Sequence, residues 1–438
     1  MVVCKFGGSS LSSETQFKKV KNIVKNCNKR RVVIVSALGK REDSDNKLTD
    51  LFYVIYTHAL HGICYEGLWE EVKTRFVDIK KDLSLTFEIE AELAHIKKNL
   101  DANLLTVDDL VSRGEYLTAR LMSEYLNFEF IDAKDVITFC ANGEIDMEQT
   151  KSKLQQKIQE KSKVVIPGFY GAYNTTGKIK LFGRGGSDIT GAIIAACLGA
   201  EKYENFTDVS GVLMADPRII DTPPAIPRLT YEELSELTYM GASVLHEASA
   251  HPVRDAGIPI HIKNTNDPDA QGTIICDGDN SENKPQITGI SGKKDFLSFN
   301  IYKNHMSSEI GFLRKTLAIF ERYQVNIEHI PTGIDHLGVV VLASGVAHCL
   351  EDLIEVLKSE LEADEVLIKD GIALITIVGR GTTHDAVFLG RTFSALGKVG
   401  INISFIAQSP KKLNIILGVK NEDYIEATKT LYQELVMS

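Results

Sequence analysis

The chain has 438 residues, of which 44% are hydrophobic and 25% charged, and its net charge at pH 7 is −10. At about 150 residues per domain this length favours three domains, and the composition excludes a single small module or an extensively disordered chain. The acidic balance excludes a basic field of the kind that attracts nucleic acid or anionic membranes, so an anionic substrate needs local cations.

The pattern of apolar runs and helical segments in residues 1–285 predicts a mostly parallel β-sheet covered by helices. Apolar runs at residues 2–6 and 32–38 flank a helix that begins with a capping box, Ser13 with Gln16. Residues 50–126 contain no strand-like run and are rich in Glu, Lys and Leu, which predicts a helical insertion. Further strands are expected at residues 164–170, 179–182, 203–207 and 258–262, with helices at 189–198 and 231–250.

A polar, turn-rich stretch at residues 277–285 predicts an interdomain linker. Beyond it the chain repeats itself with a constant offset, since 402 − 326 = 76 and 388 − 312 = 76. Each copy, residues 286–367 and 368–438, starts with an apolar run, and a helix and two strands are expected to follow, so we predict two tandem βαββ modules that pair side by side. The matched positions are Phe312, Leu313, Thr316, Asn326, Ile327, Ile330 and Leu337 with Phe388, Leu389, Thr392, Asn402, Ile403, Ile406 and Leu413.

Several protein classes are not supported by the sequence. No apolar run reaches the roughly 18 residues of a membrane span, and the N-terminus lacks the layout of a signal peptide. Seven scattered cysteines without a C-x-x-C pair predict reduced thiols and a cytoplasmic protein. The eleven histidines lack the spacing of metal ligands, so no metal site built by the chain itself is expected.

The first loop that could carry chemistry is K-F-G-G-S-S, which follows the first strand and leads into a helix. Such a loop offers bare backbone N–H groups and a positive helix end to a phosphate. Lys5 precedes the glycines, so the loop is neither a Walker A motif nor G-x-G-x-x-G. A tight turn with a surface lysine is the alternative interpretation.

Two further loops follow predicted strands. In L-F-G-R-G-G-S-D-I-T-G-A, Arg184, Ser187 and Asp188 place a planar cation, a hydroxyl and a carboxylate within five residues. In N-F-T-D-V-S-G-V-L-M-A-D-P-R, Thr207 and Asp208 end a strand at the edge where open α/β sheets bind ligands. A polar turn is the alternative for this loop.

These three loops, in this order, are similar to those of the amino-acid kinase family and of its aspartokinase group. S-R-G-E, at residues 112–115, resembles the acidic substrate motif of that group, and the tandem repeat resembles its paired ACT domains. The resemblance spans nearly the whole chain. It implies an α/β amino-acid kinase fold followed by two ACT-like regulatory modules.

The resemblance implies transfer of the γ-phosphoryl group of ATP to the side-chain carboxylate of L-aspartate, giving 4-phospho-L-aspartate, the first step of lysine, threonine and methionine biosynthesis. Mg²⁺ would be held mainly by the phosphates. A carboxylate with a pKa near 4 is already ionised at neutral pH, so this chemistry needs positioning and positive charge rather than a general base.

The resemblance also implies roles for individual residues. Lys5 and Asp188 are the expected catalytic pair, and Thr49, which is aligned across a gap, could equally be the N-cap of the following helix. The expected aspartate site is Ser36, Thr49, Glu115, Arg184 and Ser187, with Glu115 taking the ammonium and Arg184 the α-carboxylate. The expected ATP site is Lys5, Gly7, Gly8, Ser9, Thr207, Asp208, Asp216 and Arg218.

The sequence departs from the family pattern at two positions near the nucleotide. Ser243 stands in G-A-S-V-L-H-E, where many members have a lysine, and Leu213 replaces a common aromatic residue. These changes bear on ATP affinity more than on the reaction. Another cation, such as Arg218, could compensate for the missing lysine.

Regulation is predicted from differences between the two repeats. Glu328 and Met306 of the first copy correspond to Ser404 and Thr382 of the second, so only the first copy has an acid and a flexible apolar side chain. L-lysine is the expected inhibitor, and threonine is the alternative effector. The structural alternative is that Glu328 only solvates an exposed strand. The implied effector site is Met306, Gly311, Phe312, Leu313, Asn326, Ile327 and Glu328.

Paired modules with open sheet edges favour a homodimer or a dimer of dimers. Two other functions stay open at this point: a kinase for another amino acid or a nucleotide, and a catalytically weakened amino-acid sensor. The tandem repeat and S-R-G-E disfavour the first, and Ser243 is the one feature that favours the second. A Rossmann dehydrogenase is disfavoured because no G-x-G-x-x-G with a downstream ribose acid occurs.

Overall fold

The structure is a computed structural model that describes residues 1–158, 163–239, 241, 245, 249–278, 287–379, 386–408 and 413–437. It divides into two compact units. The first comprises Met1–Val212, Ala225–Tyr231 and Ser243–Asn280, and the second comprises Leu213–Pro224, Glu232–Ala242 and Ser281–Ser438. Residues 279–286, which include most of the predicted linker, lie outside the described residues, so the boundary at 285/286 stays a prediction.

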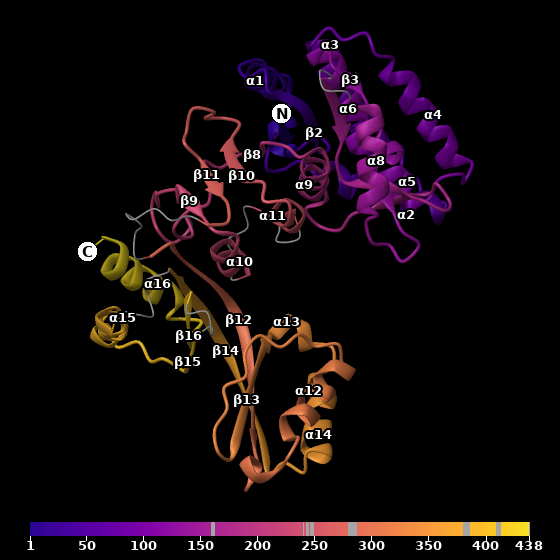
Figure 1. The fold of residues 1–438 in the computed structure, drawn as a ribbon. Coiled ribbons are helices and arrows are strands. Elements are labelled where there is room, and N and C mark those ends of the chain that lie inside the picture. The colour runs from indigo at the N-terminus through magenta and orange to yellow at the C-terminus, as the bar shows by residue number, and fades with distance from the viewer. Residues whose placement is uncertain are drawn as a thin grey trace. The chain divides into compact units, whose positions relative to one another are not determined.

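The first unit alternates strands with helices along the chain (Figure 1). Its elements are β1 (Val2–Phe6), η1 (Gly8–Leu11), α1 (Glu14–Lys25), β2 (Arg30–Val35), α2 (Leu48–Leu60), α3 (Glu66–Asp82), α4 (Ile89–Asp101), α5 (Val107–Val111), α6 (Arg113–Leu126), β3 (Glu129–Phe130), α7 (Ala133–Val136), β4 (Thr138–Phe139), α8 (Met147–Lys157), β5 (Val164–Pro167), β6 (Tyr170–Tyr173), β7 (Ile179–Leu181), α9 (Gly186–Leu198), β8 (Lys202–Thr207), β9 (Arg228–Leu229), α11 (His251–Asp255), β10 (Ile260–Asn264) and β11 (Thr273–Ile275).

Eight of these strands form one sheet in the order β3-β5-β2-β1-β8-β10-β11-β9, parallel throughout except for the pair β10 and β11. Helices α1 and α6 pack on one face, and α9 packs on the other. A parallel sheet is buried on both faces, and β1 is accordingly buried along its whole length. The predicted helix-covered, mostly parallel sheet is therefore confirmed.

Register at the centre of this sheet decides where its polar side chains lie. Cys4 pairs with Glu204 and Lys5 pairs with Asn205 across β1 and β8. Because side chains alternate along a strand, Cys4 and Glu204 lie on one face and Lys5 and Asn205 on the other.

One predicted strand is wrong in extent. Residues 164–170 do not form a single strand, because β5 ends at Pro167 and β6 belongs to a separate three-stranded sheet, β4-β6-β7. Phe169 has a φ of 77°, and a Cβ on Gly168 would lie 2.6 Å from the Cβ of Ser187. The chain leaves the main sheet here because the first turn of α9 packs against the backbone.

A predicted helix is also shorter than expected. The helix predicted at residues 231–250 is α10 (Tyr231–Tyr239), and Gly241, with a φ of 112°, cannot continue a right-handed helix. Residues 240, 242–244 and 246–248 lie outside the described residues. The stretch predicted as a helical insertion, residues 50–126, holds α3 to α6, most of α2 and no described strand.

The second unit contains the two repeats, and its five strands form one antiparallel sheet in the order β13-β12-β14-β16-β15. Its elements after α10 are β12 (Gly289–Tyr302), η3 (Met306–Ser308), α12 (Phe312–Arg322), β13 (His336–Leu342), α13 (Ala343–Val346), α14 (Leu350–Glu360), β14 (Glu365–Val378), α15 (Ala386–Lys398), β15 (Phe405–Gln408), β16 (Asn414–Lys420), α16 (Tyr424–Tyr432) and a π-helical turn at Gln433–Met437.

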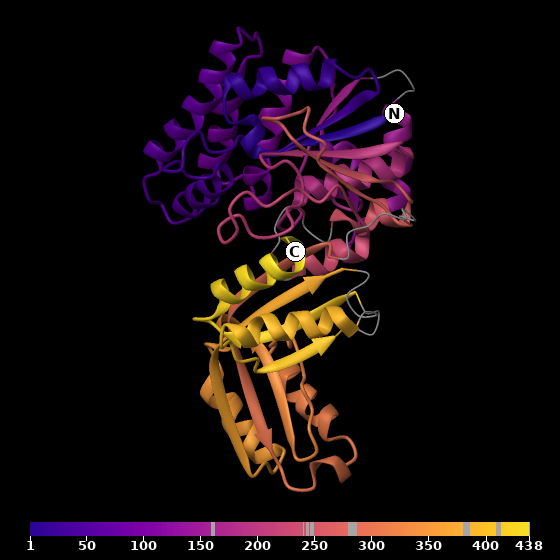
Figure 2. The ribbon, with the colours of Figure 1, turned by 90° about the vertical axis from the view of Figure 1, so that its left-hand side faces the viewer.

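The two repeats share their longest strands, as Figures 1 and 2 show. The second half of β12 pairs with the first half of β14 beside α12 and α14, and the first half of β12 pairs with the second half of β14 beside α15 and α16. The register shifts between the halves, where Asp295 and Gly371 have φ angles of 68° and 65°. The boundary predicted at 367/368 lies inside β14.

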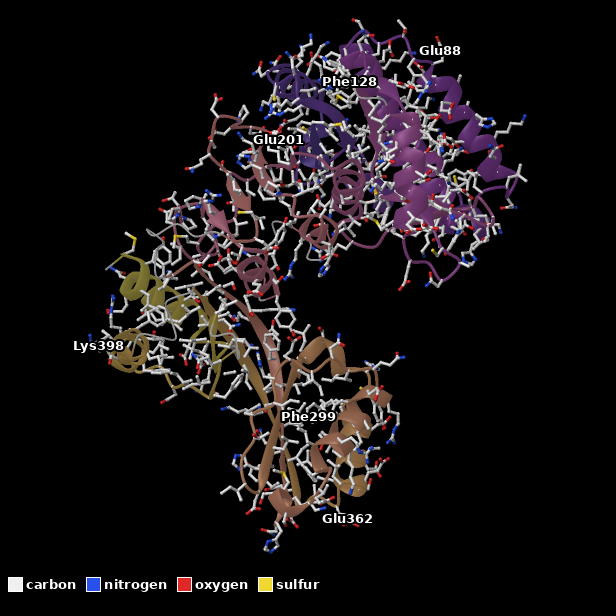
Figure 3. The ribbon with its side chains drawn as sticks, in the orientation of Figure 1. Glu88, Phe128, Glu201, Phe299, Glu362 and Lys398 are labelled. Atoms are coloured by element: carbon white, nitrogen blue, oxygen red, sulfur yellow. The ribbon has the colours of Figure 1, made fainter. Side chains whose placement is uncertain are left out.

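Each repeat has its own hydrophobic core. Phe299 is fully buried and packs edge-on against Phe320 of α12 in the first repeat, whereas Glu362 is exposed at the end of that repeat (Figure 3). The two copies differ in one strand. The strand predicted after α12 is reduced to isolated bridges, His329 with Val340 and Thr332 with Leu337, whereas the second copy forms β15.

Candidate active site

The glycine loop after β1 is built by close backbone approach. The chain enters η1 directly after Gly7, and the N–H of Gly39, beyond β2, donates to the carbonyl of Gly8 at 3.0 Å. A Cβ on Gly39 would lie 2.3 Å from that carbonyl oxygen, so this contact requires glycine. The two loops that follow β1 and β2 are thus held together at the carboxyl edge of the sheet.

Lys5 is held by partners on α9 and β8. Its Nζ lies 2.6 Å from Oδ1 of Asp188 and 3.4 Å from Oδ1 of Asn205, and Nδ2 of Asn205 donates to the same Asp188 oxygen at 2.8 Å. The Lys5 residue is 7% exposed. This arrangement brings Lys5 and Asp188 together and adds Asn205, which the sequence analysis missed although it stands inside the quoted N-F-T-D-V motif.

Glu115 lies in the first turn of α6 and is 3% exposed. Burial raises the pKa of its carboxyl to about 8, against the lowering effect of a hydrogen bond from the backbone N–H of Ala37. Within the described residues its Oε2 has no hydrogen-bond partner. A buried carboxylate with an unused oxygen is suited to binding a cation, because a cation would replace the lost hydration.

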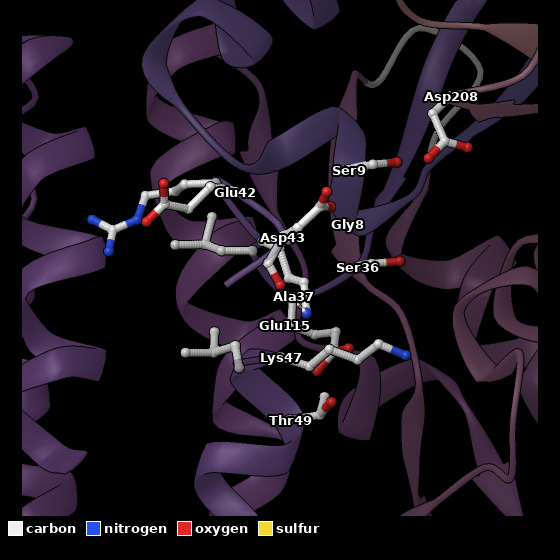
Figure 4. Close-up of a pocket in the computed structure, with 15 residues that line it drawn as sticks. Gly8, Ser9, Ser36, Ala37, Glu42, Asp43, Lys47, Thr49, Glu115 and Asp208 are labelled. Atoms are coloured by element: carbon white, nitrogen blue, oxygen red, sulfur yellow. Dashed lines mark hydrogen bonds between the residues drawn. The ribbon is translucent and has the colours of Figure 1, made fainter. Parts of the chain in front are cut away.

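A cavity of about 570 Å³ opens where β1, β2 and β8 end (Figure 4). It brings together six residues of the predicted site: Gly8, Ser9, Ser36, Thr49, Glu115 and Asp208. Figure 4 shows Ser9 and Asp208 toward one end, Lys47 and Thr49 toward the other, and Glu115 between them. The remaining lining residues are Ala37, Leu38, Gly39, Lys40, Arg41, Glu42, Asp43, Lys47 and Leu48.

The other residues predicted for catalysis and aspartate binding do not line this cavity. Lys5 is linked to it through Gly7, since a Cβ on Gly7 would lie 3.4 Å from Nζ of Lys5. Ser187 is buried against Gly168 in the first turn of α9. Arg184 is exposed on the loop before α9 and forms no hydrogen bond or ion pair within the described residues.

The residues predicted for ATP binding fall into two groups. Thr207 donates to Asp208 at 3.1 Å at the end of β8 in the first unit. Asp216 and Arg218 belong to the second unit, where the guanidinium pairs with both carboxylate oxygens at 2.7 to 3.1 Å. Leu213 is also in the second unit, and Ser243 lies outside the described residues.

The predicted effector residues surround the start of α12. Gly311 caps the helix with a φ of 86°, and Met306 and Phe312 are buried in the core of the first repeat. Leu313 and Asn326 are exposed, whereas Ile327 and Glu328 are half-buried. Glu309, which the sequence analysis did not single out, pairs with Lys303 and Lys315, both at 2.7 Å.

The charged loop between β2 and α2 was missed as a site element. Lys40, Arg41, Asp43 and Lys47 all line the cavity, but the sequence analysis treated this stretch as a gap in the alignment. Its density of charge, K-R-E-D-S-D-N-K, was the signal that could have identified it.

Comparison with known proteins matches both units. Residues 1–264 match the amino acid kinase family, and residues 375–435 match an ACT domain. Aspartokinase 3 of Bacillus subtilis is 35% identical over 99% of this chain and 98% of its own length, and the chloroplastic aspartokinase 1 of Arabidopsis thaliana is 29% identical over 100% and 80%.

Solved structures agree in fold. The crystal structure of Clostridium acetobutylicum aspartate kinase is 42% identical, covers 99% of this chain and 100% of its own, and superimposes with a TM-score of 0.93. E. coli aspartokinase III with aspartate and ADP, at 24% identity, covers 99% of each chain and has a TM-score of 0.78.

The catalytic sheet, the glycine loop with its buried lysine and the paired regulatory modules place this chain in the amino acid kinase family, among its aspartokinases. Its enzymatic class is that of an aspartate kinase, a phosphotransferase.

None of the described helices is long and apolar enough to cross a bilayer. No group of three His, Cys, Asp or Glu side chains in the described part of the chain could hold a metal ion. All seven cysteines are described, and none forms a disulfide.

Proposed function

We propose that this chain transfers the γ-phosphoryl group of ATP to the side-chain carboxylate of L-aspartate, with the residue roles set out below. The observation that carries the proposal is the buried Lys5, paired with Asp188 at 2.6 Å beside a glycine loop that lines a cavity with the unpartnered Glu115. These features support a phosphate beside Lys5 and the glycine loop, and a substrate ammonium at Glu115.

The proposed chemistry at the phosphate end is electrostatic. The ammonium of Lys5 stabilises the negative charge that spreads over the phosphoryl oxygens in the transition state, and Asp188 and Asn205 fix the position of that ammonium. The chain fits a phosphate here, because the missing side chain of Gly7 leaves room beside Nζ of Lys5.

The proposed aspartate end uses Glu115 for the substrate ammonium and hydroxyls of Ser36 and Thr49 for its remaining polar groups. Arg184 is proposed to bind the α-carboxylate with two parallel hydrogen bonds. With the ammonium held at Glu115, the side-chain carboxylate is free to point toward Ser9 and the glycine loop, where the phosphoryl group would lie.

Mg²⁺ is proposed to enter with the nucleotide and to be held mainly by its phosphates. Asp208 fits this assignment because it brings a carboxylate, a ligand that Mg²⁺ prefers, to the same cavity. When bound, the metal would neutralise part of the phosphate charge. For Thr207, Asp216 and Arg218 we propose contacts on the nucleotide side.

The test is the release of ADP by the purified chain with ATP and Mg²⁺, with and without L-aspartate. Aspartate-dependent release, with formation of a hydroxylamine-trapped acyl phosphate, is the expected result. Release that depends on glutamate or N-acetylglutamate instead would overturn the substrate assignment, and no release with any of them would favour a sensor.

We also propose feedback inhibition by L-lysine through the first repeat. Glu328 offers a carboxylate to the lysine ammonium, Gly311 opens the N-terminus of α12 to a carboxylate, and Leu313 is exposed beside that terminus. The Clostridium acetobutylicum relative is described as allosteric, and E. coli aspartokinase III has been solved with lysine and aspartate bound. The product would then enter lysine, threonine and methionine biosynthesis.

Lysine titrated against the initial rate tests this regulation. The parent protein is expected to lose activity at millimolar lysine, and Glu328→Ala to lose that inhibition while keeping its activity without lysine. By linkage, aspartate should weaken lysine binding to the same degree as lysine weakens aspartate binding. If threonine inhibits the protein and lysine does not, threonine is the effector.

Assembly as a homodimer or a dimer of dimers is proposed from the open edges of the second unit. β13 and β15 are the edge strands of its five-stranded sheet, and Ile406 on β15 is 54% exposed. Exposed strand edges with apolar side chains favour pairing with another chain. Light scattering on the purified protein should give a mass of at least two chains.

A further inference from the structure

The loop between β2 and α2 forms most of the cavity wall. Eleven of the fifteen lining residues lie between positions 36 and 49. A cavity wall made of one loop can select a substrate only if the loop is held in one conformation. Otherwise part of the binding free energy is spent on ordering the loop.

This loop is fixed by a buried cation from α3. Arg75 is 2% exposed, its Nη1 donates to the carbonyl of Asn46 at 2.9 Å, and its Nη2 lies 3.6 Å from Asp45. Asp45 in turn accepts the backbone N–H of Arg41 at 2.8 Å. The two ends of the charged segment are therefore tied to one guanidinium.

The cations of this loop are not equivalent. Nζ of Lys40 donates to the carbonyl of Asp43 at 3.0 Å, and Arg41 pairs with Asp45 and Asp78. Lys47 differs, since its ammonium has no hydrogen bond or ion pair among the residues that the structure describes. Lys47 and Glu115 therefore bring an ammonium and a carboxylate oxygen, each without a partner in the described structure, to the wall of the same cavity.

The order of groups along the cavity matches one amino acid. Figure 4 shows Lys47 between Glu115 and Thr49, toward the end opposite to Ser9 and Asp208. If the side-chain carboxylate of aspartate points toward Ser9 and its ammonium meets Glu115, its α-carboxylate faces Lys47. Resting on the proposed function, we infer that Lys47 is a substrate-binding residue that selects for the α-carboxylate, in addition to Arg184.

The test compares L-aspartate with its α-amide, which keeps the side-chain carboxylate and the ammonium but lacks the α-carboxylate charge. Lys47→Met should raise the KM for L-aspartate about tenfold, as expected for one charge-assisted hydrogen bond, and leave the KM for ATP within twofold. For the α-amide, kcat/KM should be unchanged, so the preference for L-aspartate should fall about tenfold. Lys47→Arg should retain most of that preference.

Lys73→Met is the matched control, because Lys73 is exposed on α3, pairs with Glu70 and lies outside the cavity. It should behave like the parent protein. An unchanged KM for L-aspartate in Lys47→Met, or equal losses for aspartate and its α-amide, would overturn the inference while the parent still releases ADP with aspartate. A parent without such release would instead overturn the proposed function.

Discussion

Two buried carboxylates of the first unit, Glu204 within the sheet and Glu115 at the cavity, are satisfied to different degrees. On the face of Cys4, Glu204 is 1% exposed and accepts hydrogen bonds from Nε and Nη2 of Arg30, at 2.6 and 3.3 Å, with Nζ of Lys202 at 2.8 Å. Burial alone would raise its pKa, but the hydrogen bonds from Arg30 and Lys202 lower it to about 2.

At the cavity where β1, β2 and β8 end, the buried carboxylate is satisfied less completely. Glu115 is as buried as Glu204, yet one of its oxygens has no partner in the described structure and its pKa is raised to about 8. The same degree of burial thus accompanies two functions. A carboxylate whose partners are all supplied by the chain stabilises the fold, whereas one left short of partners is available to a ligand.

The largest effect should come from breaking the saturated cluster. Glu204→Gln leaves Arg30, whose side chain is 13% exposed, without its anion, and removing one partner of a largely buried pair costs about 3 kcal/mol of unfolding free energy. Denaturant unfolding followed by the fluorescence of the single tryptophan, Trp69, measures this loss. Glu201→Gln, which removes an exposed partner of Lys29, is the control. It should leave the denaturant concentration at the midpoint of unfolding unchanged.

The next effect concerns the reacting end of the site. Lys5→Ala should lower kcat at least a hundredfold, since one preorganised charge at a developing anion contributes about 3 kcal/mol. The folded state should persist, because Asp188 keeps its hydrogen bond from Asn205. Steady-state kinetics with a circular dichroism control measures both, and near-parental turnover would contradict the phosphate role of Lys5.

A smaller and more selective effect is expected from Glu115→Gln. Loss of the anion for the substrate ammonium should raise the KM for aspartate about tenfold or more, with a smaller change for ATP. Initial rates measured over a matrix of both substrates separate the two constants. Equal increases for aspartate and ATP would assign Glu115 a structural role instead.

The last effect is a difference in pH dependence between the two carboxylates, which is small over any single pH unit, at most about 1.4 kcal/mol. The pKa of Glu204 is depressed on folding, so its contribution to stability is present above about pH 4.5 and is lost as the pH falls toward 2. The pKa of Glu115 is raised, so its contribution is present below about pH 4.5 and is lost as the pH rises through 8.

Unfolding at pH 5 and pH 8.5 tests the sign for Glu115. The parent should lose stability relative to Glu115→Gln between these values, by at most about 1.4 kcal/mol per pH unit. Parallel pH profiles for the two proteins would show that Glu115 ionises normally in the folded state.

Local sequence signals predicted the elements that depend on neighbours in the chain. The side chain of Ser13 caps α1 by accepting the N–H of Gln16, although the side chain of Gln16 turns to Asn266 instead of completing the capping box. The glycine loop, the parallel sheet and the repeat offset were also predicted from the sequence. Each depends on a short segment or on a constant spacing between residues.

Local sequence patterns did not predict the contacts between segments that are far apart in the chain. The break at Gly168 depends on Ser187 packing against it, and the second partner of Lys5 is Asn205, two hundred residues away. The loop that lines the cavity depends on Arg75 of the helical insertion, which carries no sequence motif. Such sites depend on tertiary packing rather than on a local pattern.

The shared strands β12 and β14 mean that the repeat visible in the sequence is not a unit that can be cut out. A chain ending at residue 367 would lack the partners of Gly289, Phe296 and Phe299 on β12, leaving a long strand edge open to other chains. The pairing also joins positions between 63 and 89 residues apart, which slows folding because a long loop must close first. Transplanting the second unit into another enzyme therefore requires both repeats together.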